Sequence, residues 1–362
     1  MMICWSRSEL ESYACLAIEA AKEAGAQTLL IDKFLKNAVE VDVDCVADGK
    51  RCVIGGVMQH IEEAGVHSGD STTVLPPFSL NPGVVAQIEE QTRAIAVELG
   101  VVGLMNVQFA VKDGEVYLIE VNPRASRTVP FVSKAIGLPL AKIAAQLMVG
   151  KTLDELEVHD GPLPTHVAIK EAVFPFNKFP GVDTMLGPEM RSTGEVMGIA
   201  TNAALAFGKS LIASNMQLPR RGTVFISVRD EDKPRACYLA RRLRNMGFEI
   251  LATGGTAAVL SKARIPCRLI KKMKEGSPHC VDAIEHRQVQ MVINTSQGAG
   301  EIRDSYAIRR SALLANVPYF TTMPAALAAV EALEAYAMLD HRPPQVRSVQ
   351  EWHARSKGQH EA

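Results

Sequence analysis

A hairpin signal in the middle of the chain limits the fold more than any other feature. The apolar runs LMNVQFAV (104–111) and EVYLIEV (115–121) stand on either side of the tripeptide Lys112-Asp113-Gly114. An Asp-Gly pair between two alternating runs is typical of a tight turn that joins antiparallel strands. The chain is therefore expected to contain an antiparallel sheet at this point.

Two loop geometries compete for this hairpin. A two-residue turn would pair Lys112 with Glu115 and place Gln108 and Glu120 on opposite faces of the sheet. A three-residue loop, with its glycine left-handed and a bulge, would pair Val111 with Glu115 instead. We favour the three-residue loop, because its register separates apolar from polar side chains.

In the favoured register, alternate residues divide between the two faces of the sheet. The face expected in the core holds Met105, Val107, Phe109, Val111, Tyr117, Ile119 and Val121. The polar face holds Asn106, Gln108, Glu120 and Asn122. The hairpin thus predicts one apolar face and one face rich in oxygen atoms.

The polar face offers oxygen ligands from adjacent strands, and two cations, Arg124 and Arg127, follow directly. Carboxylate and amide oxygens suit Mg²⁺, which usually also binds substrate phosphates. Arginines just beyond such a site can neutralise charge on a phosphoryl group. The spacing alone also fits a solvated sheet face with an ordinary Glu–Arg pair.

Composition excludes several classes of protein. At 362 residues, the chain is long enough for two or three domains, and 47% hydrophobic residues are usual for a globular protein. The formal net charge of -1 gives no reason to expect nucleic acid or an anionic membrane as a partner. No apolar run reaches the ~18 residues of a membrane span. The seven cysteines show no CxxC spacing, and we expect a cytoplasmic location.

Periodicity and capping signals predict the elements of the first half. Helices are expected at 8–24, 81–99, 130–137 and 139–149, and a short linker helix at 151–158. Strands are expected at 28–35 and 39–46, the second with one acidic face, and from about residue 50 into a polar loop. The segment 162–210 has no clear period and is expected to be an irregular extension packed on the first domain.

Beyond SNMQLPRRGT (214–223), the pattern changes to alternating strands and helices. Strands are expected at 223–228, 249–253, 267–272, 289–295 and 318–322. Helices are expected at 233–247, 255–265 and about 305–315. This alternation predicts a small doubly wound parallel sheet and, for the whole chain, the α/β fold class. We divide the chain at 1–150, 151–214 and 215–362, and leave open whether 348–355 is a helix or part of a loose tail.

Three runs carry a family resemblance: HSGDS (67–71), GLMNVQFAVKDGEVYLIEVNPRASRTVPF (103–131) and PLAKIAAQLMVGKTL (139–153). They resemble the C-terminal portion of the carbamoyl-phosphate synthetase large subunit. That portion is the latter part of its second ATP-grasp domain, followed by a methylglyoxal-synthase-like allosteric domain. The resemblance covers essentially the whole chain and implies ATP-dependent phosphorylation of carbamate, for arginine and pyrimidine biosynthesis.

The resemblance also implies roles for single residues. The ligands of Mg²⁺ or Mn²⁺ on ATP would be Gln108, Glu120 and Asn122. The catalytic set would be Arg127, Arg124, Glu120 and Asn122, with the arginines holding the phosphoryl group and carbamate. The other nucleotide contacts would be Lys33 and Leu35 for adenine, Glu40 for the ribose, and Gly65, Val66, His67 and Ser68 along the nucleotide.

One part of the family pattern has no counterpart in the sequence. In the family, a glycine-rich loop from the earlier half of the ATP-grasp domain covers the ATP phosphates. We therefore expect a fragment that is completed by the remainder of the large subunit and partnered by the glutaminase small subunit. Alone, it is expected to be inactive.

The second domain is expected to bind effectors at the carboxyl ends of its strands. The run Thr253-Gly254-Gly255-Thr256 precedes a helix, where phosphate is favoured, although a turn with a helix cap explains the same run. By resemblance the ligands are UMP and IMP, held by Ser227, Lys233, Thr253, Thr256, Lys272, Asn294, Thr295 and Ser296. An ornithine site between the domains would use Glu62, Asp70, Glu171 and Thr321.

Three alternatives bear on function. A methylglyoxal synthase is disfavoured, because INTSQGAGEIRD stands where that enzyme has an aspartate in SGPxGGDxQ. A second alternative is a non-catalytic nucleotide-sensing module that retains a vestigial ATP-grasp half. The third is another ATP-grasp ligase joining a carboxylate to an amine, against which the EVNPRxSR run and the trailing domain both argue.

Overall fold

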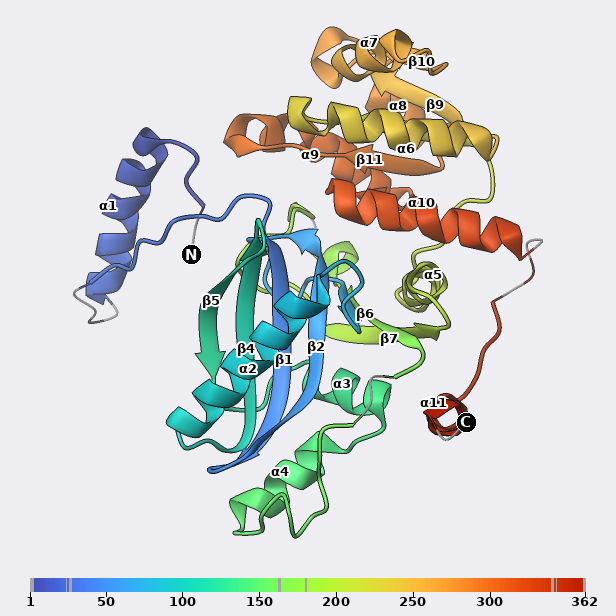
Figure 1. Cartoon of the computed structure of the whole chain (residues 1–362). Helices are drawn as coiled ribbons and strands as arrows, with labels where there is room; N and C mark the ends of the chain where they lie inside the picture. Colours follow the sequence, from blue (N-terminus) through green and yellow to red (C-terminus); the bar gives the residue numbers. More distant parts are fainter. Residues whose placement is uncertain are drawn as a thin grey trace.

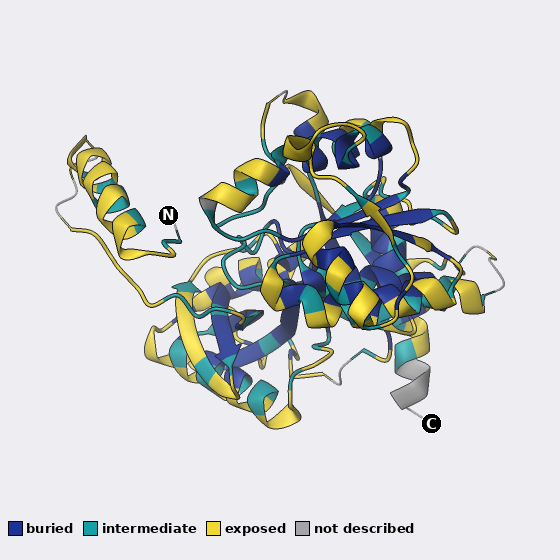
Figure 2. Ribbon diagram, turned by 90° about the horizontal axis from the view of Figure 1, so that it is seen from above, coloured by how far each residue is buried: buried dark blue, intermediate teal, exposed yellow. Residues whose placement is uncertain are grey.

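The computed structural model describes residues 3–23, 25, 28–161, 164–179, 181–339, 342 and 344–360. The first helix, α1 (Arg7–Glu23), stands apart from the body and buries none of its residues (Figures 1 and 2). The helix expected at 8–24 is confirmed over its described part, and Ala24 lies outside the described residues. The strand expected at 28–35 is wrong, because these residues form no strand.

Seven strands form a large antiparallel sheet in the order β5-β4-β1-β2-β3-β6-β7. They are β1 (Val39–Asp48), β2 (Cys52–Glu63), β3 (Thr73–Leu75), β4 (Val102–Lys112), β5 (Glu115–Asn122), β6 (Val167–Val173) and β7 (Gly194–Ala200). The alternation in β1 has the expected result. Val41, Val43 and Cys45 join an apolar core on one face, and the acidic side chains between them belong to the other.

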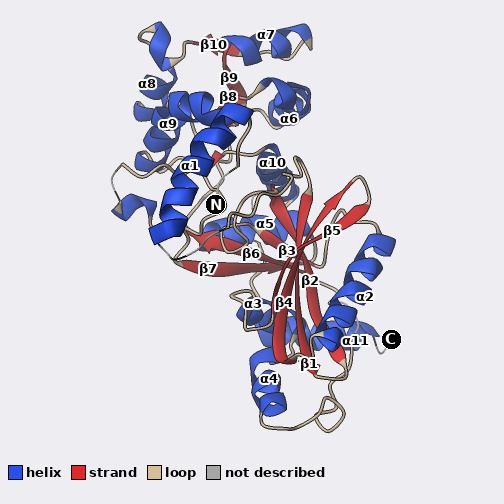
Figure 3. Ribbon diagram, turned by 90° about the vertical axis from the view of Figure 1, so that its left-hand side faces the viewer, coloured by secondary structure: helices blue, strands red, loops and turns tan. Residues whose placement is uncertain are grey.

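Helices cover parts of both faces of this sheet (Figure 3). α2 (Pro82–Glu98) is capped by Asn81 and packs on the apolar face of β1 and β4. α3 (Val129–Ile136) and α4 (Leu140–Met148) form a core with Val46 and Leu104 on the opposite face. Further along the same strands, that second face carries the polar side chains of the candidate site.

The segment 162–210 differs from its prediction as an irregular extension. It contains β6, η1 (Phe176–Lys178), β7 and α5 (Ala203–Ala213). β6 and β7 extend the large sheet, and α5 packs on both strands. The linker helix expected at 151–158 is wrong as well, because its central residues form turns.

The second half confirms the predicted parallel sheet, with strand order β10-β9-β8-β11-β12. Its strands are β8 (Thr223–Ser227), β9 (Glu249–Thr253), β10 (Arg268–Ile270), β11 (Met291–Asn294) and β12 (Tyr319–Phe320). One face packs on α6 (Lys233–Asn245), α7 (Gly254–Lys262) and α10 (Met323–Met338). The other packs on α8 (Cys280–Glu285) and α9 (Gly298–Leu314), so the α/β class holds.

The two sheets share buried contacts. Ile61, Val74 and Ile169 of the large sheet lie in the same apolar core as α10 and β8. The final helix, α11 (Val349–His360), leaves the second half and lies beside the first (Figure 1), where Trp352 enters the core of α3 and α4. Of the two possibilities left open for 348–355, a helix or a loose tail, the structure shows the helix.

No single helix among the described residues is long and apolar enough to cross a membrane. In the described part of the chain, one pair of helices, α3 and α4 with a bend of 113° between them, reaches the required length and composition together. Buried residues of both helices belong to the core that covers the large sheet.

Candidate functional site

The loop between β4 and β5 is a two-residue turn rather than the expected three-residue loop. Lys112 pairs with Glu115, and Asp113 and Gly114 both have left-handed backbones, with φ of 53° and 85°. Both central residues of the favoured hairpin turn need positive φ, which Asp-Gly supplies. The predicted pairing of Val111 with Glu115 is therefore wrong.

A register shift further along restores the predicted polar pairing. Phe109 pairs with Leu118 and Gln108 pairs with Glu120, so that Ile119 is an extra residue in β5. Such a bulge moves the following residues by one position relative to the partner strand. Because directly paired residues share a face, Gln108 and Glu120 lie together as predicted, although for a different reason.

The two-residue turn also changes which residues of β5 face the core, up to the bulge. Tyr117 and Ile119, both expected in the core, are 42% and 54% exposed. Val116 packs against the core instead, whereas Val121, which lies beyond the bulge, packs there as predicted. β5 is the edge strand of the sheet, which leaves much of its apolar surface open.

The three predicted metal ligands lie on adjacent strands. Asn122 donates from Nδ2 to Glu120 Oε1 at 2.7 Å, and Gln108, paired with Glu120, donates from Nε2 to Ser68 Oγ at 3.0 Å. The free oxygens of these side chains are hard ligands of the kind that Mg²⁺ and Mn²⁺ accept. No group of three or more His, Cys, Asp or Glu able to hold a metal occurs among the described residues, so amide ligands distinguish this set.

A buried histidine holds the predicted ribose-binding acid. The Nε2 atom of His60 lies 2.9 Å from Asp42 Oδ2, and its Nδ1 atom lies 3.3 Å from Glu40 Oε2. Burial opposes a charge on the ring, but the two carboxylates outweigh it and raise the pKa of His60 to about 9. The protonated ring hydrogen-bonds to Asp42 and forms an ion pair with Glu40, which favours the observed orientation of Glu40. His60 was not among the predicted site residues, although the acidic face of β1 is a signal that a cation lies near it.

The segment predicted to lie along the nucleotide connects Glu40 to the predicted metal ligands. Gly65 donates its backbone N–H to Glu40 Oε1 at 3.0 Å, and Ser68 reaches Gln108. His67 is fixed by backbone bonds, accepting at Nδ1 from the Gly69 N–H at 3.0 Å. Val66 and Leu35 are half-buried, whereas Lys33 is exposed.

Lys170, on β6, fixes the predicted nucleotide segment by binding the backbone of Ser68. Its Nζ atom donates to the backbone oxygen of Ser68 at 2.8 Å, and the residue is fully buried. Burial lowers the pKa of Lys170, while the nearby carboxylates, Asp42 first among them, oppose that shift.

The two predicted phosphoryl-binding arginines lie beyond the end of β5 and are exposed. Arg124 donates to Asn122 Oδ1 at 3.2 Å and to the Ala125 carbonyl at 3.1 Å. The Arg127 guanidinium contacts the sulfur of Met190. The structure therefore brings Arg124 next to a predicted metal ligand and leaves the Arg127 side chain at the surface.

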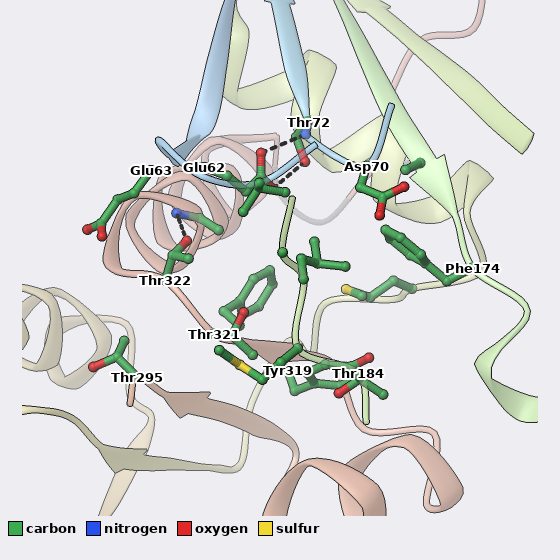
Figure 4. A pocket seen from close by; sticks show the side chains of 18 of the residues that line it. Glu62, Glu63, Asp70, Thr72, Phe174, Thr184, Thr295, Tyr319, Thr321 and Thr322 are labelled. Atoms are coloured by element: carbon green, nitrogen blue, oxygen red, sulfur yellow. Dashed lines mark hydrogen bonds between the residues drawn. The ribbon is translucent and has the colours of Figure 1, made fainter. Parts of the chain in front are cut away.

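A cavity of about 410 Å³ lies between the two halves of the chain (Figure 4). All four residues predicted for an ornithine site line it: Glu62, Asp70, Glu171 and Thr321. Thr72 donates its hydroxyl toward Glu62 or Glu171, each at 2.9 Å. Burial and then the charge of Glu62 raise the pKa of Glu171 to about 8, and burial raises the pKa of Glu62. Two acids in such a place are suited to a cationic ligand.

Asp70 differs from the other three predicted residues. Its two oxygens accept backbone N–H groups of Arg191 and Ser192 at 2.8 and 2.9 Å, and it is only 2% exposed. Its carboxylate therefore anchors the loop before β7 as well as lining the cavity.

A second cavity of about 400 Å³ lies at the carboxyl ends of the parallel strands. All eight residues predicted for nucleotide binding line it: Ser227, Lys233, Thr253, Thr256, Lys272, Asn294, Thr295 and Ser296. Thr253 is the N-cap of α7, and its hydroxyl lies 2.9 Å from that of Ser227. A Cβ added to Gly255 would come within 3.2 Å of Lys233 Nζ, so that the ammonium group lies directly over the first turn of α7.

Arg229, which was not predicted from the sequence, lines both cavities. Its guanidinium lies 3.1 Å from Glu63 and 2.8 Å from Asp232, and its backbone N–H donates to Thr295 Oγ1 at 3.1 Å. No local pattern marks this arginine, since Glu63 lies in the other half of the chain.

Comparisons with known proteins agree with this geometry. The family model for the carbamoyl-phosphate synthase L chain, ATP binding domain, matches residues 1–156, and that for the MGS-like domain matches residues 235–321. The carbamoyl phosphate synthase large chain of Rhizobium meliloti (strain 1021) is 56% identical over 86% of this chain. The chain belongs to the carbamoyl-phosphate synthase large-chain family. The large chain of Archaeoglobus fulgidus is 53% identical over 98% of this chain.

The chain spans 27% of the Rhizobium meliloti large chain and 33% of the Archaeoglobus fulgidus large chain. Among solved structures, a biotin carboxylase domain of a single-chain bacterial carboxylase matches 57% of this chain and 62% of its own, at a TM-score of 0.41 and 16% identity. That likeness is too low to add to the argument. The family membership rests on the sequence relatives and the two matched domains.

Proposed function

We propose that the large sheet carries the site that transfers a phosphoryl group from ATP to carbamate, giving carbamoyl phosphate. The observation that carries this proposal is the convergence of Gln108, Glu120 and Asn122 beside Ser68 of the nucleotide segment. Oxygen ligands and a nucleotide-binding loop within hydrogen-bond reach are the parts that phosphoryl transfer needs. Mg²⁺ or Mn²⁺ fits this donor set.

In this proposal, different residues bind the ribose, hold the metal ion and neutralise the charge of the reacting groups. Glu40, oriented by His60, would accept hydrogen bonds from the ribose hydroxyls. A metal ion held by Gln108, Glu120 and Asn122 would supply charge neutralisation at the ATP phosphates. Arg124 and Arg127 would do the same for the transferred group and the anionic carbamate, whose mutual repulsion otherwise opposes their approach.

The reverse reaction tests this proposal directly. The chain, combined with the remainder of a large subunit, would be given carbamoyl phosphate and Mg-ADP, and ATP formation would be measured. We expect Glu120→Ala to lower the rate by roughly two orders of magnitude or more, because one metal ligand is lost. Glu115→Ala is the matched control, since Glu115 lies on the same strand at the turn, away from the site. Equal rates for both variants would contradict the assignment.

We also propose that the second cavity binds a nucleoside monophosphate, UMP or IMP, as an effector. The support is the convergence of all eight predicted residues around one cavity at a helix N-terminus. The interdomain cavity is proposed to bind ornithine, whose amino groups suit Glu62 and Glu171. Calorimetric titration with each ligand, and with Glu171→Gln for ornithine, tests these two sites separately.

The biological setting belongs to the same proposal. The catalytic unit would include the remainder of a large subunit and a glutaminase small subunit, in the cytoplasm, for arginine and pyrimidine biosynthesis. The proposed domains are 1–150, 151–214 and 215–362. A purely nucleotide-sensing module is less well supported, because it needs no aligned metal ligands in the large sheet. Binding of UMP or IMP without any ATP formation would favour that alternative.

A further inference from the structure

A buried carboxylate lies under the loop that carries the two arginines. Asp44, in the middle of β1, is 0% exposed. Its Oδ1 atom accepts from Asn106 Nδ2 at 2.9 Å and from Ser126 Oγ at 2.8 Å, and its Oδ2 atom accepts from Thr128 Oγ1 at 2.6 Å. Three side-chain donors therefore converge on one acid that has no solvent contact.

Two of these donors stand immediately before and after Arg127 in the sequence. Ser126 and Thr128 are the half-buried and buried residues on either side of the exposed arginine. Thr128 is also the N-cap residue of α3, yet its hydroxyl does not cap that helix. A threonine in this place ordinarily accepts from the helix backbone. Here its hydroxyl bonds to Asp44 instead.

The third donor connects Asp44 to the opposite side of the site. Asn106 pairs with Asp44 on β1 and with Asn122 on β5. The same carboxylate is therefore fixed against β4, which carries Gln108, and against the loop that leaves β5. Removing a buried acceptor would leave its donors without partners, which is costly enough to move a loop.

We propose that Asp44 is a positioning residue that fixes the loop Pro123–Thr128, so that Arg127 is presented to the phosphoryl group of the substrate. This inference rests on the proposed phosphoryl transfer. Asp44 touches neither substrate nor metal in this assignment. It acts through Ser126 and Thr128, which hold the backbone on both sides of the arginine.

Among the described residues, the side chain of Arg127 forms no close ion pair, and only a longer-range charge interaction links it to Glu195. Arg127 is exposed, and its guanidinium contacts a methionine sulfur rather than a carboxylate. Its reach is thus set by the backbone at residues 126–128, which Asp44 fixes. Misplacing a charged group by about 1 Å can cost about a hundredfold in rate, so a loose loop would impair transfer.

The test uses two variants that break the hydrogen bond between Asp44 and Thr128, each with a matched control. Asp44→Val removes the acceptor and keeps a residue suited to a strand, and Thr128→Val removes one donor at nearly constant volume. The first control is Asp48→Val, because Asp48 ends the same strand and holds the distant turn at residues 50 and 51. The second is Thr92→Val, because Thr92 is equally buried and donates only within α2.

The measured quantities are kcat and KM in ATP formation from carbamoyl phosphate and Mg-ADP. We expect Asp44→Val and Thr128→Val to lower kcat/KM for carbamoyl phosphate about tenfold or more, with the KM for Mg-ADP changed less than about twofold. Thr128→Ser, which keeps the hydroxyl, should restore the value. Equal losses toward both substrates, or equal losses in the controls, would overturn the proposal.

Amide hydrogen exchange separates failure of this inference from failure of the proposed function. If a complete large subunit that contains the unmodified chain forms no ATP, the proposed function fails, and exchange at residues 124–128 is then compared in the unmodified chain and in Asp44→Val. Faster exchange confined to that loop in Asp44→Val supports the proposal that Asp44 fixes the loop. Unchanged exchange there overturns it, whatever the activity.

Discussion

The guanidinium of Arg229 lies 3.1 Å from the carboxylate of Glu63, and this ion pair joins the parallel sheet to the end of β2 in the large sheet. The two side chains are only 14% and 24% exposed. Close by, Lys36 reaches Glu231 at 2.6 Å, but Glu231 is 55% exposed. The segment 229–231, which borders the proposed effector cavity, is therefore tied to the first half by one shielded pair and one open pair.

The shielded pair is expected to matter more for docking of the two halves. Glu63→Gln leaves the Arg229 guanidinium with a weaker partner, and we expect the free energy of unfolding to fall by about 1–2 kcal/mol. The matched control, Glu231→Gln, should have a much smaller effect, because solvent already screens that pair. Urea unfolding distinguishes the two variants when it is measured at low salt and at about 1 M salt, where the Debye length falls to about 3 Å. Equal effects would show that burial does not set the strength of these pairs.

The raised pKa of Glu171 should make the free energy of unfolding depend on pH. The pKa of Glu171 in the folded chain is about 8, against an ordinary value of 4.5, so the folded state holds this proton more tightly than the unfolded state does. The stabilisation is complete below about pH 4.5 and is lost as the pH rises through about 8, by at most roughly 1.4 kcal/mol per pH unit. Urea unfolding at intervals from pH 5 to 8 measures it.

The variant Glu171→Gln isolates this contribution. Its amide remains neutral at every pH, so the difference in unfolding free energy between Glu171→Gln and the unmodified chain should change steadily across that interval. His60 and Asp44 titrate in both proteins and cancel from the difference. Parallel stability curves would mean that Glu171 does not hold a proton near neutral pH.

The burial of Trp352 should contribute to stability by holding the C-terminal helix α11 against the large sheet domain. Trp352 is 6% exposed, its ring lies 5.5 Å from that of His166, and the ammonium of Lys209 lies 5.7 Å from its centroid. Trp352→Ala should lower the free energy of unfolding by about 3 kcal/mol, the lower end of the usual cost for a buried aromatic. Val346→Ala, at a residue 87% exposed, should change it by less than about 0.5 kcal/mol.

The fluorescence of Trp352 gives a local measurement, because the chain has only 2 tryptophans. In a Trp5→Phe background, the emission of Trp352 should be blue-shifted in the folded chain and should shift to the red when α11 detaches. Emission typical of water in the native chain would contradict the packing of α11 on α3.

The elements that sequence predicted well are those whose burial is decided locally. The parallel strands are short apolar runs between capped helices, and their pattern survives because both faces are covered. β6 was missed because its buried centre includes Lys170 and Glu171, which reads as polar although both are buried. The run at 28–35 was mistaken for a strand, yet Leu30 is 88% exposed. The apolar side chains Leu29, Leu30 and Ile31 of this run are exposed, so they do not join an apolar core of this chain.

The candidate site shows the same limit in finer detail. The turn type could have been taken from Asp113-Gly114, whose chemistry favours the two-residue turn that forms. The compensating bulge at Ile119 could not, because a single extra residue in an edge strand leaves no pattern in the sequence. The partner of Arg229 could not be predicted either, since Glu63 lies 166 residues away. Contacts between the halves depend on docking, which local patterns do not specify.

The last prediction concerns the phosphate end of the proposed effector cavity. Lys233 lies over the first turn of α7, so its ammonium and the backbone N–H groups there would meet the same phosphate. Lys233→Met keeps the length of the side chain and removes its charge, and we expect the affinity for UMP or IMP, measured by calorimetry, to fall about tenfold or more. Lys262→Met, in the exposed last turn of the same helix, is the control and should leave the affinity unchanged. The difference between the variants should shrink as salt is raised, because the lost contribution is electrostatic. An unchanged affinity in Lys233→Met would place the phosphate elsewhere in the cavity, away from the α7 N-terminus.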